Sequence, residues 1–438
     1  SVPAVLSQQV EYVSKDGTVV RMFIVSPANS VNGPRPTILY GYGGFGVSLD
    51  PAFSVGALAW VEAGGVYANT RSDDLAVACV KALVERNALD PKQIEEVGIA
   101  ATTQSGDQGL TLGRSVALLA GIPNTVPGYA IDRMCAGAMT AVTQVASEIA
   151  VGAIDIGIAG GVEHMGRHTL GSNMDVNPRF LAERLVAADA LNMGVTAENL
   201  HDRFPTLTKQ RADAYAMGSQ KKTAAAYVDQ RFAAQLVPVA ARDAEGGWTY
   251  VTVDEPPRPD TNMDVLATLR TPFRPNGRVT AGNASGINDG ATAALLMRES
   301  KARELGMRPR ARMLAYAFAG VEPEIMGYGP VPSTEKALAK AGIGIADLDV
   351  IEINEAFAVQ VLSFLEHFGI ADDDPRVNPY GGAIAVGHPL ASSGVRLMAN
   401  MIAYFDANPK ARYGLTTMCI GLGMGATVVW ENTAEGAR

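Results

Sequence analysis

The amino-acid sequence predicts an α/β protein built from two similar halves that flank an insertion. From Arg71 onward, apolar runs of strand length alternate with longer segments whose apolar residues recur at helical spacing. This alternation stops between Asn173 and Pro275, where polar helical segments and a proline-rich stretch replace it. It returns after Arg308, so we expect a duplicated α/β architecture with one inserted region.

The expected elements follow one another in a regular order. Asp73 and Asp74 mark the start of the first helix, because acidic side chains are favoured beside the positive end of the helix dipole. The first half is expected to contain helices at 75–86, 111–120 and 134–151 and strands at 97–101 and 154–159. A polar helix at 209–227 belongs to the insertion. The second half is expected to contain strands at 310–318, 350–353, 414–420 and 427–430 and helices at 333–341 and 356–368.

The first residues of the chain follow a different pattern. Gln9 to Val25 alternates apolar and polar residues around a Lys15-Asp16-Gly17 turn, which predicts a β-hairpin. Pro36 to Tyr40 reads as a short apolar strand, and Val55 to Ala63 as a helix that ends at a pair of glycines.

Length and composition narrow the class of protein. A chain of 438 residues with 47% apolar and 18% charged residues is expected to fold into two or three well-packed domains. A net charge of −9 argues against non-specific nucleic-acid binding. We find no run of about 18 uncharged apolar residues and no basic stretch followed by an apolar core near the start, so we expect no membrane span and a cytoplasmic location.

The cysteines and histidines do not indicate a disulfide framework or a metal site. Cys79, Cys135 and Cys419 are an odd number of thiols far apart in sequence, which favours a reducing compartment. His164 and His168 have i, i+4 spacing but no evident third ligand, so no metal is expected. Gly41 to Gly46 matches a dinucleotide-binding pattern, but no helix follows directly, so no nucleotide site is expected there.

Two residues are candidates for covalent and acid–base chemistry. Cys135 precedes a helix rich in small residues, where the helix dipole favours the thiolate; the alternative is a buried cysteine that fills space. His388 lies in the glycine-dense segment Gly381 to Pro389, where it could act as a general base at a cavity edge. The alternative for His388 is a loop histidine bonded to the backbone.

Three further segments could complete a site. The segment Cys419 to Gly425 alternates glycines, which permits a tight turn with inward N–H groups or only a strand turn. Asn354 could fix a water and Glu355 could orient His388, or Asn354 could cap the next helix. The polar loop Gly282 to Gly290 could contact a phosphate or pantetheine, or be an ordinary turn.

Taken together and in this order, these motifs resemble the thiolase family. The likeness covers about residues 70–438 and includes the residues around Cys135, the Gly282 to Gly290 loop, Asn354 to Phe357, Gly387 to Pro389 and the turn after Cys419. The resemblance implies a duplicated αβαβα five-layer architecture with a loop-domain insertion. It places the N-terminal domain at 70–172 and 276–307, the loop domain at 173–275 and the C-terminal domain at 308–438.

The resemblance also implies a reaction, 3-ketoacyl-CoA thiolysis in fatty-acid β-oxidation. Cys135 would attack the 3-keto carbon while His388 accepts the thiol proton. Cleavage of the carbon–carbon bond would release an acetyl-CoA carbanion that Cys419 protonates. Coenzyme A, a co-substrate rather than a bound cofactor, would then remove the shortened acyl group from Cys135.

The family pattern assigns the supporting groups and partners as well. One oxyanion site would use His388 and a water held by Asn354, and the other the backbone N–H groups of Cys135 and Gly421. Ser285 matches the position that contacts the pantetheine arm. The family implies a homodimer or homotetramer and a possible β-oxidation hydratase/dehydrogenase subunit as partner.

The segment 1–69 departs from the family. Residues from Glu11 to about Tyr67 resemble a fragment of the prolyl oligopeptidases, in which Tyr42 would supply an oxyanion-hole hydroxyl. No peptidase nucleophile, acid or histidine motif follows, so peptidase activity is not expected. The segment replaces the usual first strand, which the resemblance places in the middle of the N-terminal sheet, and we expect Pro36 to Tyr42 to stand in for it.

Two alternatives to an active degradative thiolase stay open. One is a catalytically impaired chimera or a non-catalytic thiolase-like subunit, because of the atypical N-terminal segment. The other is a biosynthetic acetoacetyl-CoA thiolase, because the same residues catalyse both directions. Acyl chain-length preference is not encoded in these motifs.

Overall fold

The computed structural model describes residues 5–13, 17, 19–27, 65–171, 175–242 and 247–434. The chain forms two compact units, Ser1–Gly65 and Val66–Arg438. In the first unit, β1 (Val5–Val13) and β2 (Val19–Pro27) pair antiparallel along their whole length, which confirms the predicted hairpin. The strand and helix expected at 36–40 and 55–63 and the glycine pattern at 41–46 lie outside the described residues.

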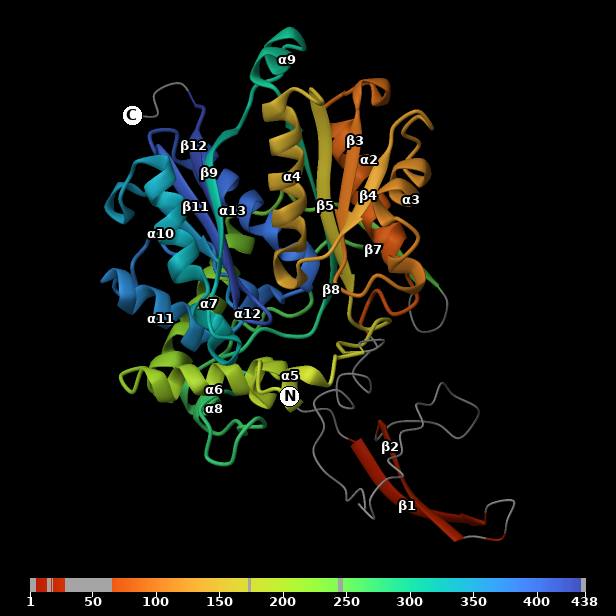
Figure 1. Cartoon of the computed structure of the whole chain (residues 1–438), viewed down its shortest axis with the longest axis vertical. Helices are drawn as coiled ribbons and strands as arrows, with labels where there is room; N and C mark the ends of the chain where they lie inside the picture. Colours follow the sequence, from red (N-terminus) through yellow and green to blue (C-terminus); the bar gives the residue numbers. More distant parts are fainter. Residues whose placement is uncertain are drawn as a thin grey trace. The chain divides into compact units, whose positions relative to one another are not determined.

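The second unit has the five-layer α/β architecture that was expected (Figure 1). Two central helices lie between the two large sheets: α4 (Gly137–Val151) and α13 (Ser393–Ala407). Two helices cover the outer face of each sheet: α2 (Ser72–Arg86) and α3 (Leu112–Leu119) on the first, and α10 (Pro330–Ala341) and α11 (Ala358–Phe368) on the second.

The first large sheet has four strands in the order β4-β3-β5-β8. Their bounds are β3 (Glu96–Ala100), β4 (Gly128–Ile131), β5 (Ile156–His164) and β8 (Asp289–Met297). β3 is parallel to both β4 and β5, and β8 is antiparallel to β5. Every residue of β5 is buried, as expected for a strand covered by helices on both faces.

The second sheet also has four strands, and three of them repeat the order and directions of three strands of the first. Its order is β10-β11-β12-β9, with β9 (Ala311–Gly320), β10 (Val350–Ile353), β11 (Tyr413–Ile420) and β12 (Met424–Asn432). β10 is parallel to β11, and β12 is antiparallel to β11, so β10, β11 and β12 correspond to β3, β5 and β8. This correspondence confirms the duplication.

The fourth strand, β9, has no counterpart in the first sheet among the described residues. β9 pairs antiparallel with β12 at the edge of its sheet. The expectation of a missing strand in the middle of the first sheet is therefore wrong, because β3 pairs directly with β5. Among the described residues, the position without a strand is the outer edge of β8, which is called the open edge below. The stretch 36–42, expected to fill the gap, lies outside the described residues.

The open edge of β8 borders a large cavity. The cavity has a volume of about 2050 Å³ and is lined by residues of β8, β9, α4 and α13. All nine residues of β8 are partly exposed, whereas the corresponding strand β12 is buried at seven of its nine positions. The difference follows from pairing, because β12 has a neighbour on each side and β8 has a described neighbour on only one.

Small residues allow α4 and α13 to approach closely. A Cβ atom added at Gly394 of α13 would lie 2.6 Å from the backbone nitrogen of Met139 in α4. A Cβ atom added at Gly137, the first residue of α4, would lie 2.7 Å from the Cβ of Ala100. Any larger residue at these positions would push the central helices away from their neighbours.

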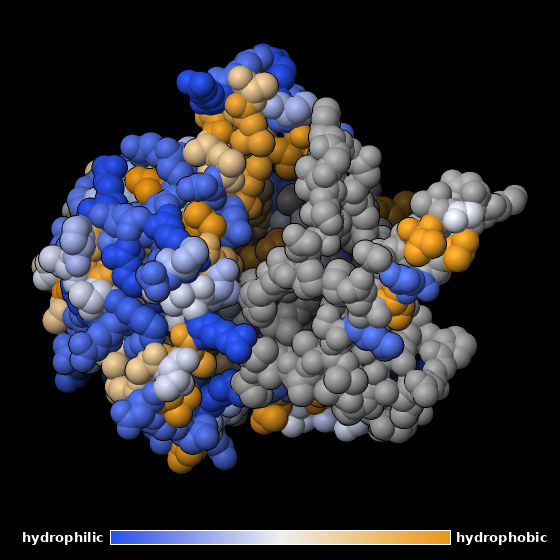
Figure 2. Space-filling view, turned by 90° about the horizontal axis from the view of Figure 1, so that it is seen from below, coloured by the Kyte–Doolittle hydropathy of each residue, from blue (hydrophilic) through white to orange (hydrophobic). Residues whose placement is uncertain are grey.

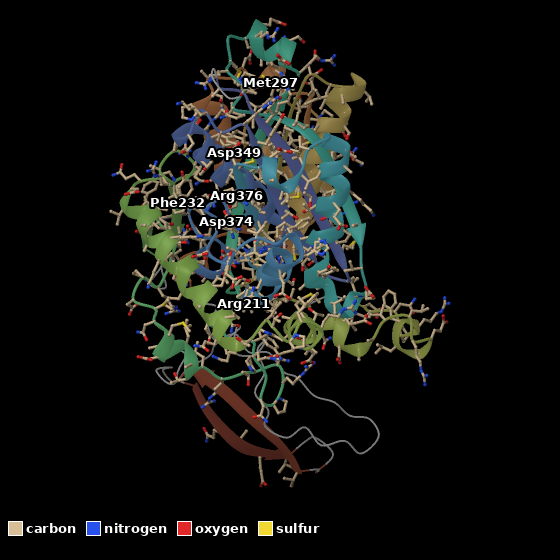
Figure 3. All side chains as sticks on the ribbon, turned by 90° about the vertical axis from the view of Figure 1, so that its left-hand side faces the viewer. Arg211, Phe232, Met297, Asp349, Asp374 and Arg376 are labelled. Carbon is tan, nitrogen blue, oxygen red and sulfur yellow. The ribbon has the colours of Figure 1, made fainter. Side chains whose placement is uncertain are left out.

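The insertion consists mainly of helices. Its elements are α5 (Arg179–Ala182), α6 (Met193–Arg203), α7 (Lys209–Val228), the β6 (Val239–Arg242) and β7 (Trp248–Val251) hairpin, and α8 (Met263–Ala267). Arg211 of α7, labelled in Figure 3, binds Asp372 of the second half. The two hydrogen bonds are 2.6 and 2.8 Å long. This pair joins the insertion to the second half.

Short helices complete the second unit. They are α9 (Glu299–Glu304), α12 (Ala383–Val386) and the 3-10 helices η1 (Pro91–Gln93), η2 (Gly106–Gln108), η3 (Met134–Ala136), η4 (Ala188–Leu191), η5 (Pro323–Tyr328), η6 (Ile345–Asp347) and η7 (Leu390–Ser392).

One helical segment, Met134–Val151, is long and apolar enough to cross a membrane by length and composition. It comprises η3 and α4, and 56% of it is buried inside the protein. Its place between the two sheets is that of a core helix (Figure 1). On the face shown in Figure 2, hydrophilic residues cover most of the described surface and hydrophobic residues form smaller patches.

The open edge of β8 predicts uneven protection of the two corresponding strands. Backbone amides of β8 that point away from β5 should exchange with solvent faster than amides of β12, which has partners on both sides. Hydrogen exchange followed by mass spectrometry measures this difference peptide by peptide. Equal protection of Asp289–Met297 and Met424–Asn432 would show that the edge of β8 is covered.

Candidate active site

Cys135 lies in a constrained turn at the entrance to α4. The residue before it, Met134, has a φ of 45°, a left-handed conformation that costs a non-glycine residue about 1–2 kcal/mol. The Asp132 carboxylate stabilises this turn by accepting a hydrogen bond of 2.6 Å from the Met134 N–H. Such local strain is typical of functional sites, because only a position with a use for the conformation keeps it.

The turn between β11 and β12 places Cys419 and Gly421 beside Cys135. Ile420 pairs with Met424 at the end of the hairpin, and Leu422 and Gly423 have φ angles of 60° and 74°. A Cβ atom added at Gly421 would lie 2.6 Å from the Met134 sulfur, so a larger residue here would require the Met134 side chain to shift. The predicted tight turn is therefore present, and it packs against the residues beside Cys135.

The two thiols are neutral in this environment. Burial raises the pKa of Cys135 to about 11, although the backbone N–H groups of Gly421 and of Cys135 itself favour the thiolate. Burial, and then the nearby Cys135, raise the pKa of Cys419 well above its ordinary value. The helix start and the N–H groups favour the thiolate, as expected, but desolvation outweighs them.

His388 is a buried side chain held by other side chains. It lies between α12 and η7 with 4% of its surface exposed. Its Nδ1 atom is 2.6 Å from the Ser393 hydroxyl, and its Nε2 atom is 3.3 Å from Nδ2 of Asn354. Burial, and then the positive charge of Arg396, lower the pKa of His388 to about 3, so the imidazole is neutral.

Asn354 follows β10 directly and is fully buried. Its backbone N–H donates to the Thr417 carbonyl at 2.9 Å, which continues the pairing of β10 with β11. Its side-chain oxygen accepts a hydrogen bond of 2.9 Å from Arg396. The alternative role as a helix cap does not apply, because Phe357 is the residue that precedes the first turn of α11.

Glu355 has a different role from the one expected. Its carboxylate accepts hydrogen bonds from the Tyr215 hydroxyl at 3.0 Å, the Ser219 hydroxyl at 2.6 Å, the Asn378 amide at 2.8 Å and the Ile384 N–H at 3.1 Å. None of these donors is His388. Glu355 therefore anchors α7 of the insertion and the loop before α12, and does not orient the histidine.

The loop containing Ser285 lies beside the segments of Asn354 and His388. The Ser285 N–H donates to the Ala356 carbonyl at 3.0 Å, and the side chain of Ser285 is partly exposed. A Cβ atom added at Gly387 would lie 2.2 Å from the Asn288 side chain. The structure thus brings the five sequence motifs into one region.

Comparisons with known proteins agree with this arrangement. The family model "Thiolase, N-terminal domain" matches residues 57–300, and the model "Thiolase, C-terminal domain" matches residues 307–432. Together they span most of the chain.

The chain belongs to the thiolase family.

Relatives of known name and structure lie within this family. A 3-ketoacyl-CoA thiolase of Shewanella baltica is 45% identical over 370 residues, which cover 84% of this chain and 95% of that protein. One of Psychrobacter arcticus is 42% identical over 368 residues, covering 84% and 93%.

Two solved thiolase structures share the fold. Human mitochondrial 3-ketoacyl-CoA thiolase has a TM-score of 0.76 and 32% identity, covering 84% of this chain and 94% of that one. The acetyl-CoA acetyltransferase of Bacillus anthracis has a TM-score of 0.74 and 34% identity, covering 83% and 93%.

These comparisons support only the thiolase part of the resemblance. The N-terminal family model begins at residue 57, inside the segment that was compared with the prolyl oligopeptidases. The peptidase resemblance of the earlier residues finds no support in them.

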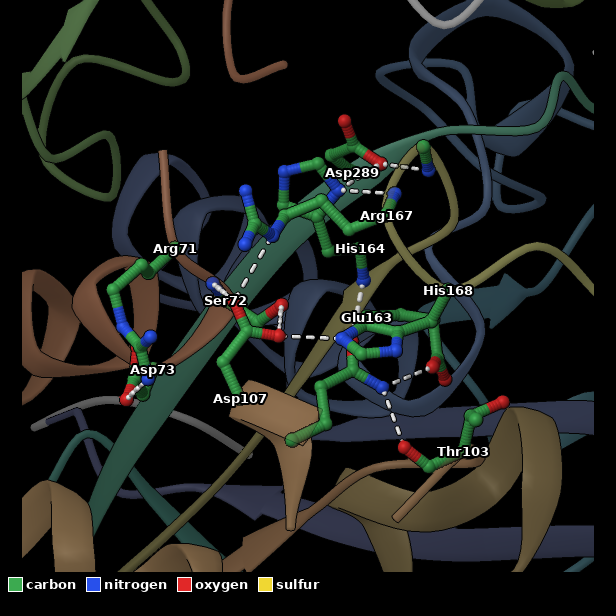
Figure 4. Close-up of polar contacts among 12 residues, drawn as sticks. Arg71, Ser72, Asp73, Thr103, Asp107, Glu163, His164, Arg167, His168 and Asp289 are labelled. Atoms are coloured by element: carbon green, nitrogen blue, oxygen red, sulfur yellow. Dashed lines mark hydrogen bonds and ion pairs between the residues drawn. The ribbon is translucent and has the colours of Figure 1, made fainter. Parts of the chain in front are cut away.

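The histidine pair at 164 and 168 belongs to a polar network and not to a cluster of metal ligands (Figure 4). His164 contacts the Asp289 carboxylate and the Tyr67 carbonyl, whereas His168 contacts the Asp107 carboxylate. Among the described residues, no group of three such side chains is placed to hold a metal ion.

The neighbouring Glu163 connects the two halves of the thiolase. Its carboxylate accepts from the Thr102 N–H at 3.1 Å and from the Gln108 side chain at 2.9 Å, both in the first half. It also accepts from the Ala391 N–H at 3.2 Å, three residues after His388. Glu163 thereby holds the segment that follows His388 against β5 of the first sheet.

Sequence reasoning missed three residues of the site: Ser393, Arg396 and Glu352. A signal for Arg396 was present, because it is the only charged residue in the first thirteen of α13. A lone charge on an otherwise uncharged buried helix needs a partner. Glu352 alternates with apolar residues in β10, and burial raises its pKa to about 8.

Replacement of Glu355 by alanine should destabilise the protein strongly. Four buried donors would lose their acceptor, and each unsatisfied donor costs about 1–3 kcal/mol, so a loss of several kcal/mol is expected. Urea unfolding measures the change. Glu335→Ala, which removes an exposed pair with His367, is the control and should change stability by less than about 1 kcal/mol. Similar losses in both variants would contradict the anchoring role.

Proposed function

We propose that this thiolase cleaves a 3-ketoacyl-CoA with coenzyme A to give a shortened acyl-CoA and acetyl-CoA. The observation that carries the proposal is that Cys135 lies beside Cys419 and Gly421, while His388 contacts Asn354 and precedes η7, which packs against the turn of Cys135. Two thiols, one neutral imidazole and inward N–H groups are the groups that carbon–carbon thiolysis needs. The relatives named 3-ketoacyl-CoA thiolase support the same reaction.

The first half-reaction forms an acyl-enzyme. His388 takes the proton of the Cys135 thiol as the sulfur bonds to the 3-keto carbon. The bond between C2 and C3 of the substrate then breaks, and its electron pair remains on the acetyl-CoA fragment. Cys419 gives its proton to this carbanion and becomes a thiolate. Acetyl-CoA leaves, and the shortened acyl group stays on Cys135.

The second half-reaction restores both thiols. The thiolate of Cys419 takes the proton of incoming coenzyme A, whose sulfur attacks the acyl carbon. The bond between Cys135 and the acyl group breaks, and His388 returns its proton to the Cys135 sulfur. Protons and electrons balance, and the only product of this half is the shortened acyl-CoA.

Negative charge on the reacting oxygens is stabilised by donors that are already in place. The backbone N–H groups of Gly421 and Cys135 act near the Cys135 sulfur, so they suit the oxyanion formed at the attacked carbon. His388 with a water held by Asn354 serves the thioester oxygen of the acetyl-CoA fragment. Ser285 contacts the pantetheine arm, and coenzyme A acts as a co-substrate with no permanently bound cofactor.

The remaining features of the proposal concern cellular context. The degradative direction and a place in fatty-acid β-oxidation are favoured by the names of the relatives with the highest identity given above. A biosynthetic acetoacetyl-CoA thiolase is the second candidate, favoured by the structural likeness to an acetyl-CoA acetyltransferase. A cytoplasmic homodimer or homotetramer, with a possible hydratase/dehydrogenase partner, stays a prediction, as does the impaired chimera.

Cys135→Ala should abolish thiolysis, because the acyl group then has no acceptor. The assay follows loss of the enolate absorbance of acetoacetyl-CoA in the presence of coenzyme A. Cys79→Ala is the matched control: Cys79 donates its thiol hydrogen to the Ala291 carbonyl at 3.4 Å and is outside the site, so this variant should stay active. Turnover by Cys135→Ala would exclude the proposed nucleophile.

Mass spectrometry of the enzyme with acetoacetyl-CoA should find an acetyl group on the peptide that contains Cys135. This follows from the first half-reaction, in which only Cys135 forms a bond to carbon. The group should be absent from the Cys419 peptide. An acetyl group on Cys419 would reverse the two assignments, and a folded protein with no adduct and no turnover would favour the impaired chimera.

The acid side of the pH profile should be displaced to low pH. A general base works only when unprotonated, and the pKa of His388 is lowered to about 3 instead of the usual value near 6.5. The free enzyme therefore keeps its base as pH falls from 7 to 5. Log kcat/KM, measured over this range within the limits of stability, should stay level in that interval. A fall centred near pH 6.5 would contradict a buried neutral His388.

A further inference from the structure

A buried arginine contacts the asparagine that contacts the proposed base. Arg396, on the first turn of α13, donates from Nη2 to Oδ1 of Asn354 at 2.9 Å. The Nδ2 atom of the same amide is 3.3 Å from Nε2 of His388 and 3.5 Å from its Nδ1. The three side chains thus form a chain of contacts from a fixed positive charge to the imidazole.

The hydrogen bond from Arg396 fixes the orientation of the side-chain amide of Asn354. A guanidinium group has only donors, so the atom that it contacts must be the amide oxygen. The NH₂ group of Asn354 must then face His388. Because an NH₂ group has no lone pair to offer, the ring nitrogen to which it donates carries no hydrogen, and Nε2 is the nearer of the two.

The contact of Ser393 with the other ring nitrogen leads to the same tautomer. Nδ1 of His388 is 2.6 Å from the Ser393 hydroxyl, which in turn donates to the Pro389 carbonyl at 3.4 Å. A hydroxyl that gives its hydrogen to a carbonyl accepts from its other neighbour. The hydrogen of the neutral ring therefore belongs on Nδ1, which agrees with the contact to Asn354.

We propose that Arg396, through Asn354, and Ser393 are positioning residues that hold His388 in the tautomer with hydrogen on Nδ1 and a free lone pair on Nε2. This inference rests on the proposed function, in which Nε2 accepts the proton of Cys135. Neither residue touches the substrate. Their effect is to keep the base in one protonation pattern and one orientation before the substrate arrives.

Arg396 also acts through its charge. The ionisable groups that act on Arg396 are Glu352, Glu355 and Asp254, and Arg396 is the charged group that acts on His388. A positive charge near the ring disfavours the imidazolium. The proton that His388 takes from Cys135 is therefore held weakly, which favours its return to sulfur in the second half-reaction.

The test uses the full chain and two readouts. Arg396→Met removes the donor and its charge, and the double variant Arg396→Met with Glu352→Gln removes a facing carboxylate as well, in case the single variant does not fold. Ser393→Ala removes the contact to Nδ1. Arg211→Met is the control. It removes an arginine that binds Asp372 and takes no part in the contacts among Arg396, Asn354 and His388.

The first readout is the nitrogen NMR spectrum of His388, assigned by loss of its signals in His388→Gln. Wild type and Arg211→Met should show hydrogen on Nδ1 near neutral pH. Ser393→Ala and the folded Arg396 variant should show a mixture of tautomers, and the Arg396 variant should titrate at higher pH. Unchanged tautomer and titration in both variants would overturn the proposal. This readout needs no turnover, so it is independent of the proposed reaction.

The second readout is thiolysis. The folded Arg396 variant and Ser393→Ala should lose about tenfold to hundredfold in kcat with little change in KM, because they disturb a general base and no substrate contact. The acid limb of kcat/KM should move upward only in the Arg396 variant. If the Arg396 and Ser393 variants lose only stability, as expected for Arg211→Met, then Arg396 and Ser393 have a purely structural role and the proposal is wrong. If wild type itself shows no thiolysis, the proposed function fails, and the NMR result still decides the positioning role.

Discussion

The close contact between the two halves is the constraint on which the site depends. Of the groups that act on the reacting atoms, the first half supplies Cys135, whereas His388, Asn354, Cys419 and Gly421 come from the second. Proton transfer requires these groups to meet at hydrogen-bonding distance. The glycines at the junction of α4 and α13, together with the bond from Ala391 to Glu163, set that distance. The catalytic arrangement is thus a result of packing between duplicated domains.

This packing also decides the resting electrostatics. The thiols and the imidazole are poorly solvated, so each is most stable without charge. An ion pair of thiolate and imidazolium would have to be kept in a poorly solvated place beside Arg396. A neutral pair avoids that cost and develops charge only when a substrate oxygen can share it with the N–H groups nearby. Burial therefore sets the order of events as well as the resting state.

The sequence predicts the structure best where apolar residues recur with the period of a helix or a strand. Helices such as Ser72–Arg86 and strands such as Val350–Ile353 follow from local patterning, and the glycine turn after Cys419 follows from the freedom of its residues. The partners of Glu355 and Arg396 could not be predicted, because they come from segments far apart in the chain. Strand order, and with it the open edge of β8, is likewise a property of tertiary pairing.

The unpaired side of β8 has a consequence for the handling of the protein. The run from Ala291 to Met297 contains no charged residue and no proline, and its outer side has no partner strand among the described residues. Such edges are templates on which strands of other molecules add, and natural proteins usually protect them with charges or bulges. The outer side of β8 is therefore the place where we expect strands of other molecules to add in concentrated solutions. Screening of additives and dilute refolding are the practical responses to this geometry.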